Sequence, residues 1–232
     1  MKIVSLIPAR EGSKSIPNKN IVDLDGQPLI AYTILDSLRS KLIEETYVST
    51  DSEKIAMISE QYGAEVPFLR PKIFATDNSL DIDYIKHFLN WYFDTYSEYP
   101  QIIVLLRPTT PIREIEVIDK AIEFFLNNIN EADSLRSVHQ LTESPFKYFY
   151  KNGKYLDPLL GKRFPIKEFW NLPKQLFKTV YKPNGYVDII KPEIVLNLNS
   201  VYGDKILAFE TERVVEIDSK EDLEYLKFKL KE

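Results

Sequence analysis

The residues whose types and spacing suggest chemistry gather in a loop near the start of the chain. The loop follows a short apolar run at residues 3–7, which indicates a buried strand. Its members are cations, a hydroxyl and a glycine: Arg10, Gly12, Ser13, Lys14 and Lys19. After a strand, such a loop can direct backbone N–H groups and cations at a polyphosphate. Neither a Walker loop nor a dinucleotide fingerprint is present, and a solvated basic turn is the alternative.

The ordered pattern of this stretch resembles a family signature. Residues 7–20 read I-P-A-R-E-G-S-K-S-I-P-N-K-N, which is similar to the N-terminal nucleotide-binding signature of the acylneuraminate cytidylyltransferases, the CMP-sialic acid synthetase family. Most relatives carry a second glycine where this chain has Glu11. The resemblance implies that the loop binds a nucleoside triphosphate, through Ala9, Arg10, Gly12, Ser13, Lys14, Lys19 and Asn20.

Apolar periodicity predicts the elements that position this loop. We expect strands at residues 3–7, 46–50 and 102–106, alternating with helices that begin near Pro28 and Ser52 and span 80–96 and 114–126. This alternation predicts an α/β fold, a mainly parallel sheet with helices on both faces and ligands at the carboxyl ends of its strands. The resemblance implies a nucleotide-diphospho-sugar transferase-like fold. Further strands are expected at 186–190, 205–209 and 214–217, before a helix that Ser219 and Asp222 open as a capping box.

Composition limits the classes of function. The chain has 232 residues, 44% of them hydrophobic, so we expect one domain over residues 1–232. Its net charge of −5 argues against coating nucleic acid, and it has no cysteine for disulfides or thiolate chemistry. Its longest apolar run, 102–106, is far shorter than the roughly 20 residues of a membrane helix, and charges from Arg10 onward argue against a signal peptide. We expect a soluble cytoplasmic protein with no nucleic-acid or membrane partner.

The apolar residues of the segment 142–178 follow neither the helix period nor the strand period. The segment is rich in proline, lysine and aromatic residues, and by composition alone could form a long irregular surface segment. In the family the corresponding region projects from the core and exchanges contacts with a second subunit, which implies a dimerisation arm and a homodimer. Exposed aromatic side chains would agree with such an interface. The candidates are Phe146, Tyr148, Phe149, Phe169 and Trp170.

Other stretches match the family in order and spacing. Arg70 and Ser79 stand where family members use an arginine and a small polar residue around the nucleotide. The sequence 105–113 reads L-L-R-P-T-T-P-I-R, and 174–185 reads K-Q-L-F-K-T-V-Y-K-P-N-G. The resemblance implies that these two stretches contact the acceptor sugar, through Arg107, Thr109, Lys174, Tyr181 and Asn184.

These stretches depart from the family pattern in three places, and Lys174 stands where an acceptor-binding arginine is usual. Arg107 replaces a glutamine that touches the acceptor sugar, and residues 186–188 read Tyr-Val-Asp where Ala-x-Tyr is common. A guanidinium suits carboxylate or phosphate recognition. An arginine at the ligand edge of a sheet needs an anion, so we expect Arg107 to contact an acidic group of the acceptor rather than CTP.

Two carboxylates near the end of the chain suggest a metal site. Residues 215–219 read V-E-I-D-S and are similar to the family's Asp-Ile-Asp-Ser pair of magnesium ligands. On a strand, Glu216 and Asp218 would share a face with α-carbons roughly 6.5–7 Å apart, and could hold Mg²⁺ directly or through water. An exposed polar edge is the alternative. His87 and His139 match neither a metal cluster nor a triad, and we expect them to be structural.

The residues and the resemblance together imply a nucleotidyltransferase. The expected reaction joins CTP to a sialic-acid-like (nonulosonic) sugar acid, giving the CMP-sugar and pyrophosphate, with Lys14, Arg10 and Asp218 as catalytic residues and Mg²⁺ as cofactor. One alternative is another anionic acceptor, a sugar 1-phosphate or a phosphonate, which Arg107 favours. Another is a nucleotide-binding regulator without catalysis, suggested by Glu11 and Glu216. The sequence leaves the acceptor and the nucleobase open.

Overall fold

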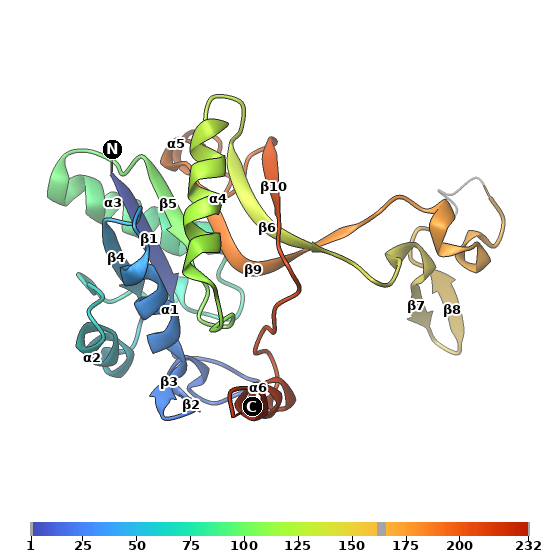
Figure 1. Cartoon of the computed structure of the whole chain (residues 1–232), viewed down its shortest axis with the longest axis horizontal. Helices are drawn as coiled ribbons and strands as arrows, with labels where there is room; N and C mark the ends of the chain where they lie inside the picture. The colour runs from blue at the N-terminus through green and yellow to red at the C-terminus, as the bar shows by residue number, and fades with distance from the viewer. Residues whose placement is uncertain (1, 162–165, 232) are drawn as a thin grey trace.

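The computed structural model describes residues 2–161 and 166–231 (Figure 1). Residues 1, 162–165 and 232, which include part of the predicted 142–178 segment, lie outside the described residues. In the described ranges, six strands form one sheet in the order β10-β6-β9-β5-β1-β4. Their bounds are β1 (Ile3–Pro8), β4 (Glu45–Ser49), β5 (Ile102–Leu105), β6 (Ser134–Gln140), β9 (Tyr181–Ile190) and β10 (Ile206–Glu210).

The sheet is mixed and mostly parallel, as predicted. Strand β1 pairs in parallel with β4 and β5, and β10 pairs in parallel with β6. Strand β9 runs antiparallel between β5 and β6. It begins five residues before the predicted Tyr186, because its first residues pair with the end of β6, where Tyr181 lies opposite Gln140.

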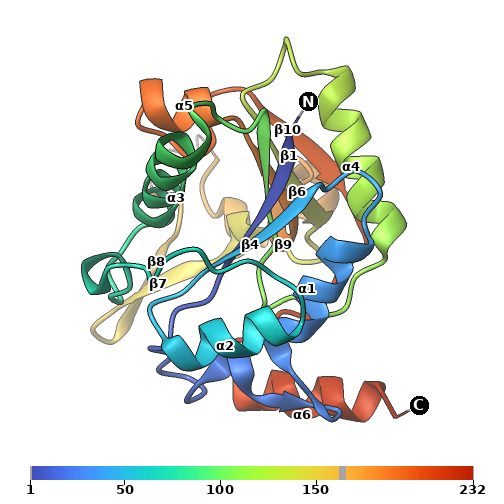
Figure 2. The same ribbon diagram turned by 90° about the vertical axis from the view of Figure 1, so that its left-hand side faces the viewer.

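Helices cover both faces of the sheet, which confirms the predicted architecture (Figure 2). Ile3 and Ile7 of β1 belong to an apolar cluster with α1 and α4, whereas Val4 and Leu6 belong to a cluster with α3 and α5 on the opposite face. The alternation follows from the period of two along a strand. The helices are α1 (Leu29–Arg39), α2 (Glu53–Gln61), α3 (Asp81–Tyr96), α4 (Ile115–Asn127), α5 (Pro192–Asn197) and α6 (Lys220–Lys229).

Short elements complete the described chain. Two hairpins are formed by β2 (Asp23–Leu24) with β3 (Gln27–Pro28) and by β7 (Phe149–Asn152) with β8 (Tyr155–Pro158). The short 3-10 helices are η1 (Lys19–Ile21), η2 (Lys72–Phe74), η3 (Pro145–Lys147), η5 (Phe169–Asn171) and η6 (Lys174–Leu176).

A third apolar cluster joins the end of the chain to its start. Ile16 and Leu24 pack with Ile217 and with Leu223 of α6. The predicted capping box of α6 is present. The predicted strand at residues 214–217 is wrong, because the chain has left β10 at the edge of the sheet and crosses toward α6 (Figure 1). The cluster therefore brings the carboxylates at 216 and 218 to the first loop.

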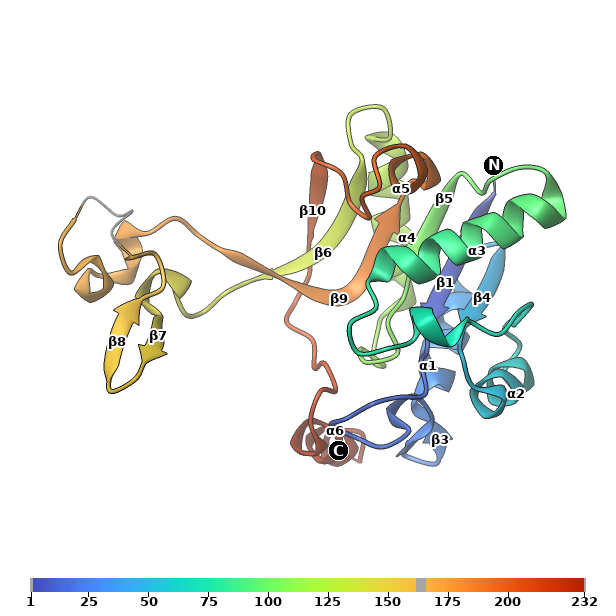
Figure 3. The same cartoon turned by 180° about the vertical axis from the view of Figure 1, so that it is seen from behind.

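The segment between β6 and β9 projects from the rest of the protein and carries the β7–β8 hairpin (Figure 3). Tyr148 and Phe149 are exposed, as predicted, whereas Phe169 is only 1% exposed, so the prediction is wrong for that side chain. Trp170 and Phe146 are half-buried. The Trp170 ring meets Phe149 and Phe169 edge-on, with centroids 5.6 and 5.2 Å apart. The projecting segment thus has a small apolar cluster of its own, which covers some of its aromatic surface.

A buried carboxyl on α1 should make stability depend on pH. Asp36 is 9% exposed, and its Oδ2 has no hydrogen-bond partner among the described residues. Burial raises the pKa of Asp36 from 3.8 to about 6, although Arg113 and Arg39 oppose the shift. Between these values the folded state binds more protons than the unfolded state, so the free energy of unfolding falls as the pH rises.

We expect Asp36→Asn to remove this loss. The difference in free energy of unfolding between the variant and the wild type should increase by about 1–3 kcal/mol from about pH 4 to pH 7. This is the size that the shift in pKa implies. Urea unfolding at both pH values measures the difference. Asp94→Asn, at an exposed position of α3, is the control. Parallel stability curves for wild type and Asp36→Asn would contradict the prediction.

Candidate functional site

A cavity of about 450 Å³ lies at the carboxyl ends of β1 and β5. Three segments line it: the loop after β1, the stretch from Arg70 to Tyr84, and residues 107–109. The predicted nucleotide residues that line it are Arg10, Gly12, Ser13, Lys14, Lys19, Asn20, Arg70 and Ser79. Ala9 does not line it, because its side chain is buried in the core and its N–H donates to Ser49 O at 2.9 Å.

Two cations of the loop share one carboxylate across this cavity. Asp77 Oδ1 lies 3.0 Å from Arg10 Nη1, and Asp77 Oδ2 lies 2.5 Å from Lys14 Nζ. The hydrogen bond from Lys14 is the main cause that lowers the pKa of Asp77, and Arg10 adds to it. Sequence reasoning selected Ser79 in this region and missed Asp77, because the contact joins residues far apart in the chain.

Asp77 therefore forms ion pairs with Arg10 and Lys14, the two cations that a polyphosphate would need. Removing its charge in Asp77→Asn should lower the KM for a nucleoside triphosphate by roughly two- to fivefold, since the carboxylate no longer competes for exposed cations. Initial rates at varied nucleotide concentration measure this change. Asp25→Asn, in the β2–β3 turn, is the matched control. A raised KM in Asp77→Asn would instead make Asp77 part of the binding site.

Glu11 directs its carboxylate away from the cavity. Its Oε1 accepts a hydrogen bond from Ser52 Oγ at 3.0 Å, and its backbone N–H donates to Asp51 Oδ1 at 2.9 Å. Asn20 holds the same loop, because its Nδ2 donates to Arg10 O at 2.8 Å. Glu11 thus adds no carboxylate to the cavity, which removes one reason for the alternative of an inactive regulator.

Arg70 and Ser79 have structural partners at the cavity wall. Arg70 is buried, donates from Nε to Ser49 Oγ at 3.0 Å, and lies over the Tyr84 ring at 4.5 Å from its centroid. Burial lowers the pKa of Arg70. Ser79 Oγ donates to Ile73 O at 3.0 Å and accepts from the Thr76 N–H at 2.9 Å. It closes the turn that carries Asp77, and contact of either side chain with a nucleotide stays a prediction.

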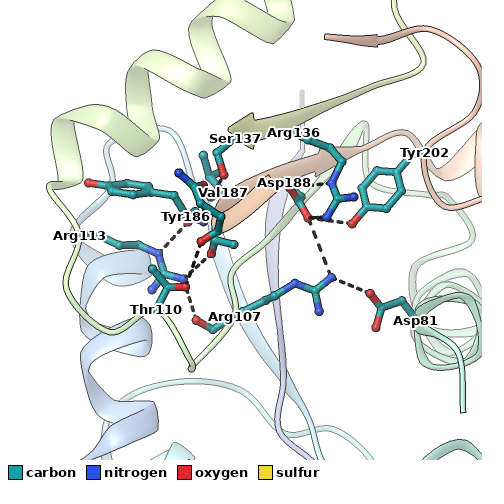
Figure 4. A network of polar contacts seen from close by, with 12 residues as sticks. Asp81, Arg107, Thr110, Arg113, Arg136, Ser137, Tyr186, Val187, Asp188 and Tyr202 are labelled. Carbon is teal, nitrogen blue, oxygen red and sulfur yellow. Dashed lines mark hydrogen bonds and ion pairs between the residues drawn. The ribbon is translucent and has the colours of Figure 1, made fainter. Parts of the chain in front are cut away.

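Arg113 holds the loop after β5 against β9 (Figure 4). It is buried and donates to Arg107 O at 2.7 Å, Tyr186 O at 2.7 Å and Gly185 O at 3.1 Å. Burial lowers the pKa of Arg113 to about 10, although Asp36 opposes the shift. These bonds fix the backbone from which Arg107 extends.

The anion that Arg107 requires is supplied by the protein itself. Arg107 Nη2 donates to Asp81 Oδ2 at 2.6 Å and lies 4.0 Å from Asp188 Oδ2. Burial lowers the pKa of Arg107, but Tyr84 and Asp81 outweigh it and the pKa is raised. The sequence argument assumed that the acceptor supplies this anion, whereas Asp81 already does so. Contact of Arg107 with an acidic group of the acceptor stays a prediction. Arg107 and Asp188, which both depart from the family pattern near the acceptor-binding stretches, thus form an ion pair with each other.

Glu216 and Asp218 both line a second cavity of about 790 Å³, between the base of the projecting segment and α6. Glu216 lies 3.5 Å from Lys182 Nζ, and Asp218 lies 3.2 Å from Lys19 Nζ. Lys19 Nζ also donates to Ile217 O at 3.0 Å. Lys19 also lines the first cavity, so its side chain lies between the first cavity and the second.

Two carboxylates are oxygen donors of the kind that Mg²⁺ prefers, and binding of Mg²⁺ at Glu216 and Asp218 stays a prediction. Among the described residues, no group of three or more His, Asp or Glu side chains is arranged to hold a metal ion. Mg²⁺ commonly takes one or two protein carboxylates together with water and substrate phosphates. Glu216 and Asp218 can supply that pair, although the reasoning from a shared strand face is wrong because the segment is not a strand.

The predicted acceptor residues are not all brought together. Thr109 lines the first cavity, and its carbonyl accepts the Ile217 N–H at 2.7 Å. Lys174 belongs to the projecting segment, where its Nζ donates to Thr142 O at 2.5 Å, and Tyr181 is exposed at the start of β9. Asn184 is buried, and its Nδ2 donates to Thr211 Oγ1 at 2.7 Å. Lys174, Tyr181 and Asn184 do not line the first cavity.

The two histidines occupy different surroundings. His87 packs edge-on against Phe68, with ring centroids 4.5 Å apart. His139 is buried and lines the second cavity. Burial lowers the pKa of both, with Arg70 adding to the effect on His87 and Lys182 on His139. His87 fits the predicted structural role.

A sequence profile of the cytidylyltransferase family matches residues 4–169. The chain belongs to this family. The N-acylneuraminate cytidylyltransferase of Escherichia coli O18:K1:H7 is 33% identical over 229 residues, 96% of this chain and 51% of the relative. The CMP-N,N'-diacetyllegionaminic acid synthase of Legionella pneumophila is 35% identical over 204 residues, 88% of this chain and 84% of the relative. The predicted resemblance is confirmed, and the chain spans about half the length of the E. coli relative.

A third relative and two solved structures extend the comparison for this cytidylyltransferase family member. The pseudaminic acid cytidylyltransferase of Campylobacter jejuni is 31% identical over 157 residues, 68% of this chain and 64% of the relative. A CMP:2-keto-3-deoxy-manno-octonic acid synthetase complexed with CTP has a TM-score of 0.73 at 15% identity, covering 100% of this chain and 99% of that one. The 4-diphosphocytidyl-2C-methyl-D-erythritol synthase of Anaerococcus prevotii has a TM-score of 0.65 at 13% identity, with coverage of 100% and 99%. These structures confirm the predicted fold class.

No helix in the described part of this family member is long and apolar enough to cross a membrane.

Proposed function

We propose that this family member transfers a cytidylyl group from CTP to a sialic-acid-like (nonulosonic) sugar acid, giving the CMP-sugar and pyrophosphate. The observation that carries the proposal is the position of Lys19 between the two cavities. Lys19 lines the cavity of the loop cations, and its Nζ lies 3.2 Å from Asp218 Oδ1 in the second cavity. A triphosphate held by the loop would then have its α-phosphate beside the paired carboxylates. The acceptor class is supported by the names of the relatives, which specify acylneuraminic, legionaminic and pseudaminic acids.

The reaction requires positioning and charge stabilisation more than covalent chemistry. The anomeric hydroxyl of the sugar acid attacks the α-phosphorus, the bond from that phosphorus to pyrophosphate breaks, and the hydroxyl proton passes to solvent. When the triphosphate binds, Arg10 and Lys14 leave Asp77 and contact the phosphates instead. There they stabilise the charge that develops on the leaving group. Glu216 and Asp218 would hold Mg²⁺, which when bound neutralises phosphate charge.

We also propose that two copies of the chain associate through the projecting segment, residues 142–178. The support is its extended placement and its exposed apolar side chains, which a monomer would leave in water. They are Tyr148, Phe149, Tyr150, Tyr155 and Leu156. In such a homodimer the segment of one copy can bring Lys174 to the site of the other. Light scattering during size-exclusion chromatography measures the mass, and a monomer at micromolar concentration would contradict the proposal. We place the reaction in the cytoplasm, where CTP is available.

A pyrophosphate-release screen tests the function. It pairs each of the four nucleoside triphosphates with nonulosonic acids, sugar 1-phosphates and phosphonates. We expect turnover with CTP and a nonulosonic acid. Turnover confined to a sugar phosphate or a phosphonate would favour the alternative acceptor class, and nucleotide binding without turnover would favour a regulator.

A further inference from the structure

The peptide unit between Arg10 and Glu11 is held at both of its polar atoms. Arg10 O accepts a hydrogen bond from Asn20 Nδ2 at 2.8 Å, and Asn20 is itself buried. The N–H of the same peptide unit, which belongs to Glu11, donates to Asp51 Oδ1 at 2.9 Å. Because a peptide unit is planar, the two bonds fix the direction in which the chain leaves Arg10.

The side chain of Glu11 adds a further attachment. Its Oε1 accepts a partly buried hydrogen bond from Ser52 Oγ at 3.0 Å, and Ser52 is only 5% exposed. Ser52 is the N-cap residue of α2, but its side chain makes no capping hydrogen bond to that helix. The Glu11 carboxylate therefore lies at the N-terminus of α2, where the helix dipole favours a negative charge.

The end of β4 gives this attachment a rigid support. Ser49 O accepts hydrogen bonds from the Ala9 N–H at 2.9 Å and from Arg70 Nη2 at 2.5 Å. Ser49 Oγ accepts another from Arg70 Nε at 3.0 Å. The residues that follow β4 thus hold both the start of the first loop and the Arg70 wall of the first cavity, and Glu11 extends this support by two residues beyond Ala9.

The second half of the loop has no comparable support. Within the described ranges, no backbone group of residues 12–15 takes part in a hydrogen bond. A Cβ atom at Gly12 would meet nothing within 4 Å. The Lys14 side chain is 83% exposed, whereas that of Arg10 is 35% exposed. The two cations that pair with Asp77 therefore extend from backbone of different rigidity.

We propose that Glu11 is a positioning residue that fixes the backbone of Arg10 for the triphosphate before the nucleotide arrives, whereas Lys14 is ordered only when the phosphates bind. The inference rests on the proposed function and concerns its nucleotide side. A group that is already held loses less freedom on binding, so the ligand binds more tightly. Glu11 does not line the first cavity and acts through Arg10. A glycine at position 11 could not form the bond to Ser52.

The sign of the Glu11 effect separates positioning from charge repulsion. If the carboxylate only repelled the phosphates, its removal would tighten binding. We expect Glu11→Ala to raise the Kd for CTP about three- to tenfold, which is the size of one lost hydrogen bond. Glu11→Gln keeps an oxygen for Ser52 and should restore most of the affinity. Calorimetry with CTP measures these constants.

Two further variants test the partner and the loss of charge. Ser52→Ala should weaken CTP binding as much as Glu11→Ala does, and the double variant should bind no more weakly than either single variant, because both changes remove one bond. α2 should persist in Ser52→Ala, since this side chain does not cap it. Glu53→Ala, which removes an exposed carboxylate in the first turn of α2, is the matched control and should bind CTP as the wild type does.

A comparison of two backgrounds gives a readout that a merely structural role would not produce. In an Arg10→Ala background, Glu11→Ala should have little further effect on the Kd for CTP, because Glu11 acts through Arg10. In a Lys14→Ala background, its full effect should remain. Thermal unfolding of each variant checks the fold.

Tighter CTP binding by Glu11→Ala, an unchanged Kd, or an equal loss in both backgrounds would overturn the inference. If any of these results accompanied normal pyrophosphate release, the proposed function would stand without it. The expected pattern of CTP affinities in a protein that releases no pyrophosphate would contradict the proposed function and leave the role of Glu11 supported. A protein that does not bind CTP would overturn both.

Discussion

Lys14→Ala should lower kcat for pyrophosphate release by roughly a hundredfold or more, which is the effect of losing one preorganised charge at a developing anion. The Lys14 side chain is 83% exposed and lies in the loop that lines the first cavity. Its described partner in the absence of substrate is Asp77. The variant should fold normally, because this side chain contributes no core packing.

Steady-state kinetics with saturating CTP and acceptor measure the effect, and thermal unfolding checks the fold. Lys54→Ala, an exposed lysine of α2, is the control for loss of a surface cation. In the Lys14→Ala background, Asp77→Asn should have less effect on the KM for CTP than in the wild type, since one of its two partners is gone. A well-folded Lys14→Ala variant with near-normal kcat would rule out the catalytic role of Lys14.

Asp218→Asn should abolish most Mg²⁺-dependent turnover, by roughly a hundredfold or more, because it removes a charged oxygen ligand and keeps the shape of the side chain. Asp218 is 73% exposed, and its described side-chain partner is Lys19. Its backbone N–H still donates to Asp222 Oδ2, so the start of α6 should be preserved.

Activity measured against Mg²⁺ concentration tests this prediction, and Mn²⁺ binding in the presence of CTP provides a readout that does not depend on turnover. Glu216→Asp is the matched control, because it keeps a carboxylate and should retain activity. Full turnover of Asp218→Asn at limiting Mg²⁺ would show that the carboxylate pair is not the metal site.

Local sequence patterns predicted most of the fold. The apolar run at residues 3–7 became β1, and the helical periods at 80–96 and 114–126 became α3 and α4 with shifts of a residue or so. The capping box at Ser219 was also correct. These signals succeed because apolar spacing and capping groups act between residues close in sequence. The loop cations were found for the same reason, since they lie within ten residues of one another.

The sequence by itself therefore determined most of the helices and strands of the core, the family and the loop of cations. Only the tertiary structure decided which charges meet. The contact of Arg107 with Asp81 and Asp188 depends on the register of β9 against β5, and that of Lys14 with Asp77 depends on how two loops face each other. Residues 214–217 crossed to α6 because burial of Ile217 in the cluster beneath the first loop replaces pairing with a neighbouring strand. Such contacts join residues distant in sequence, and no local period or propensity encodes them.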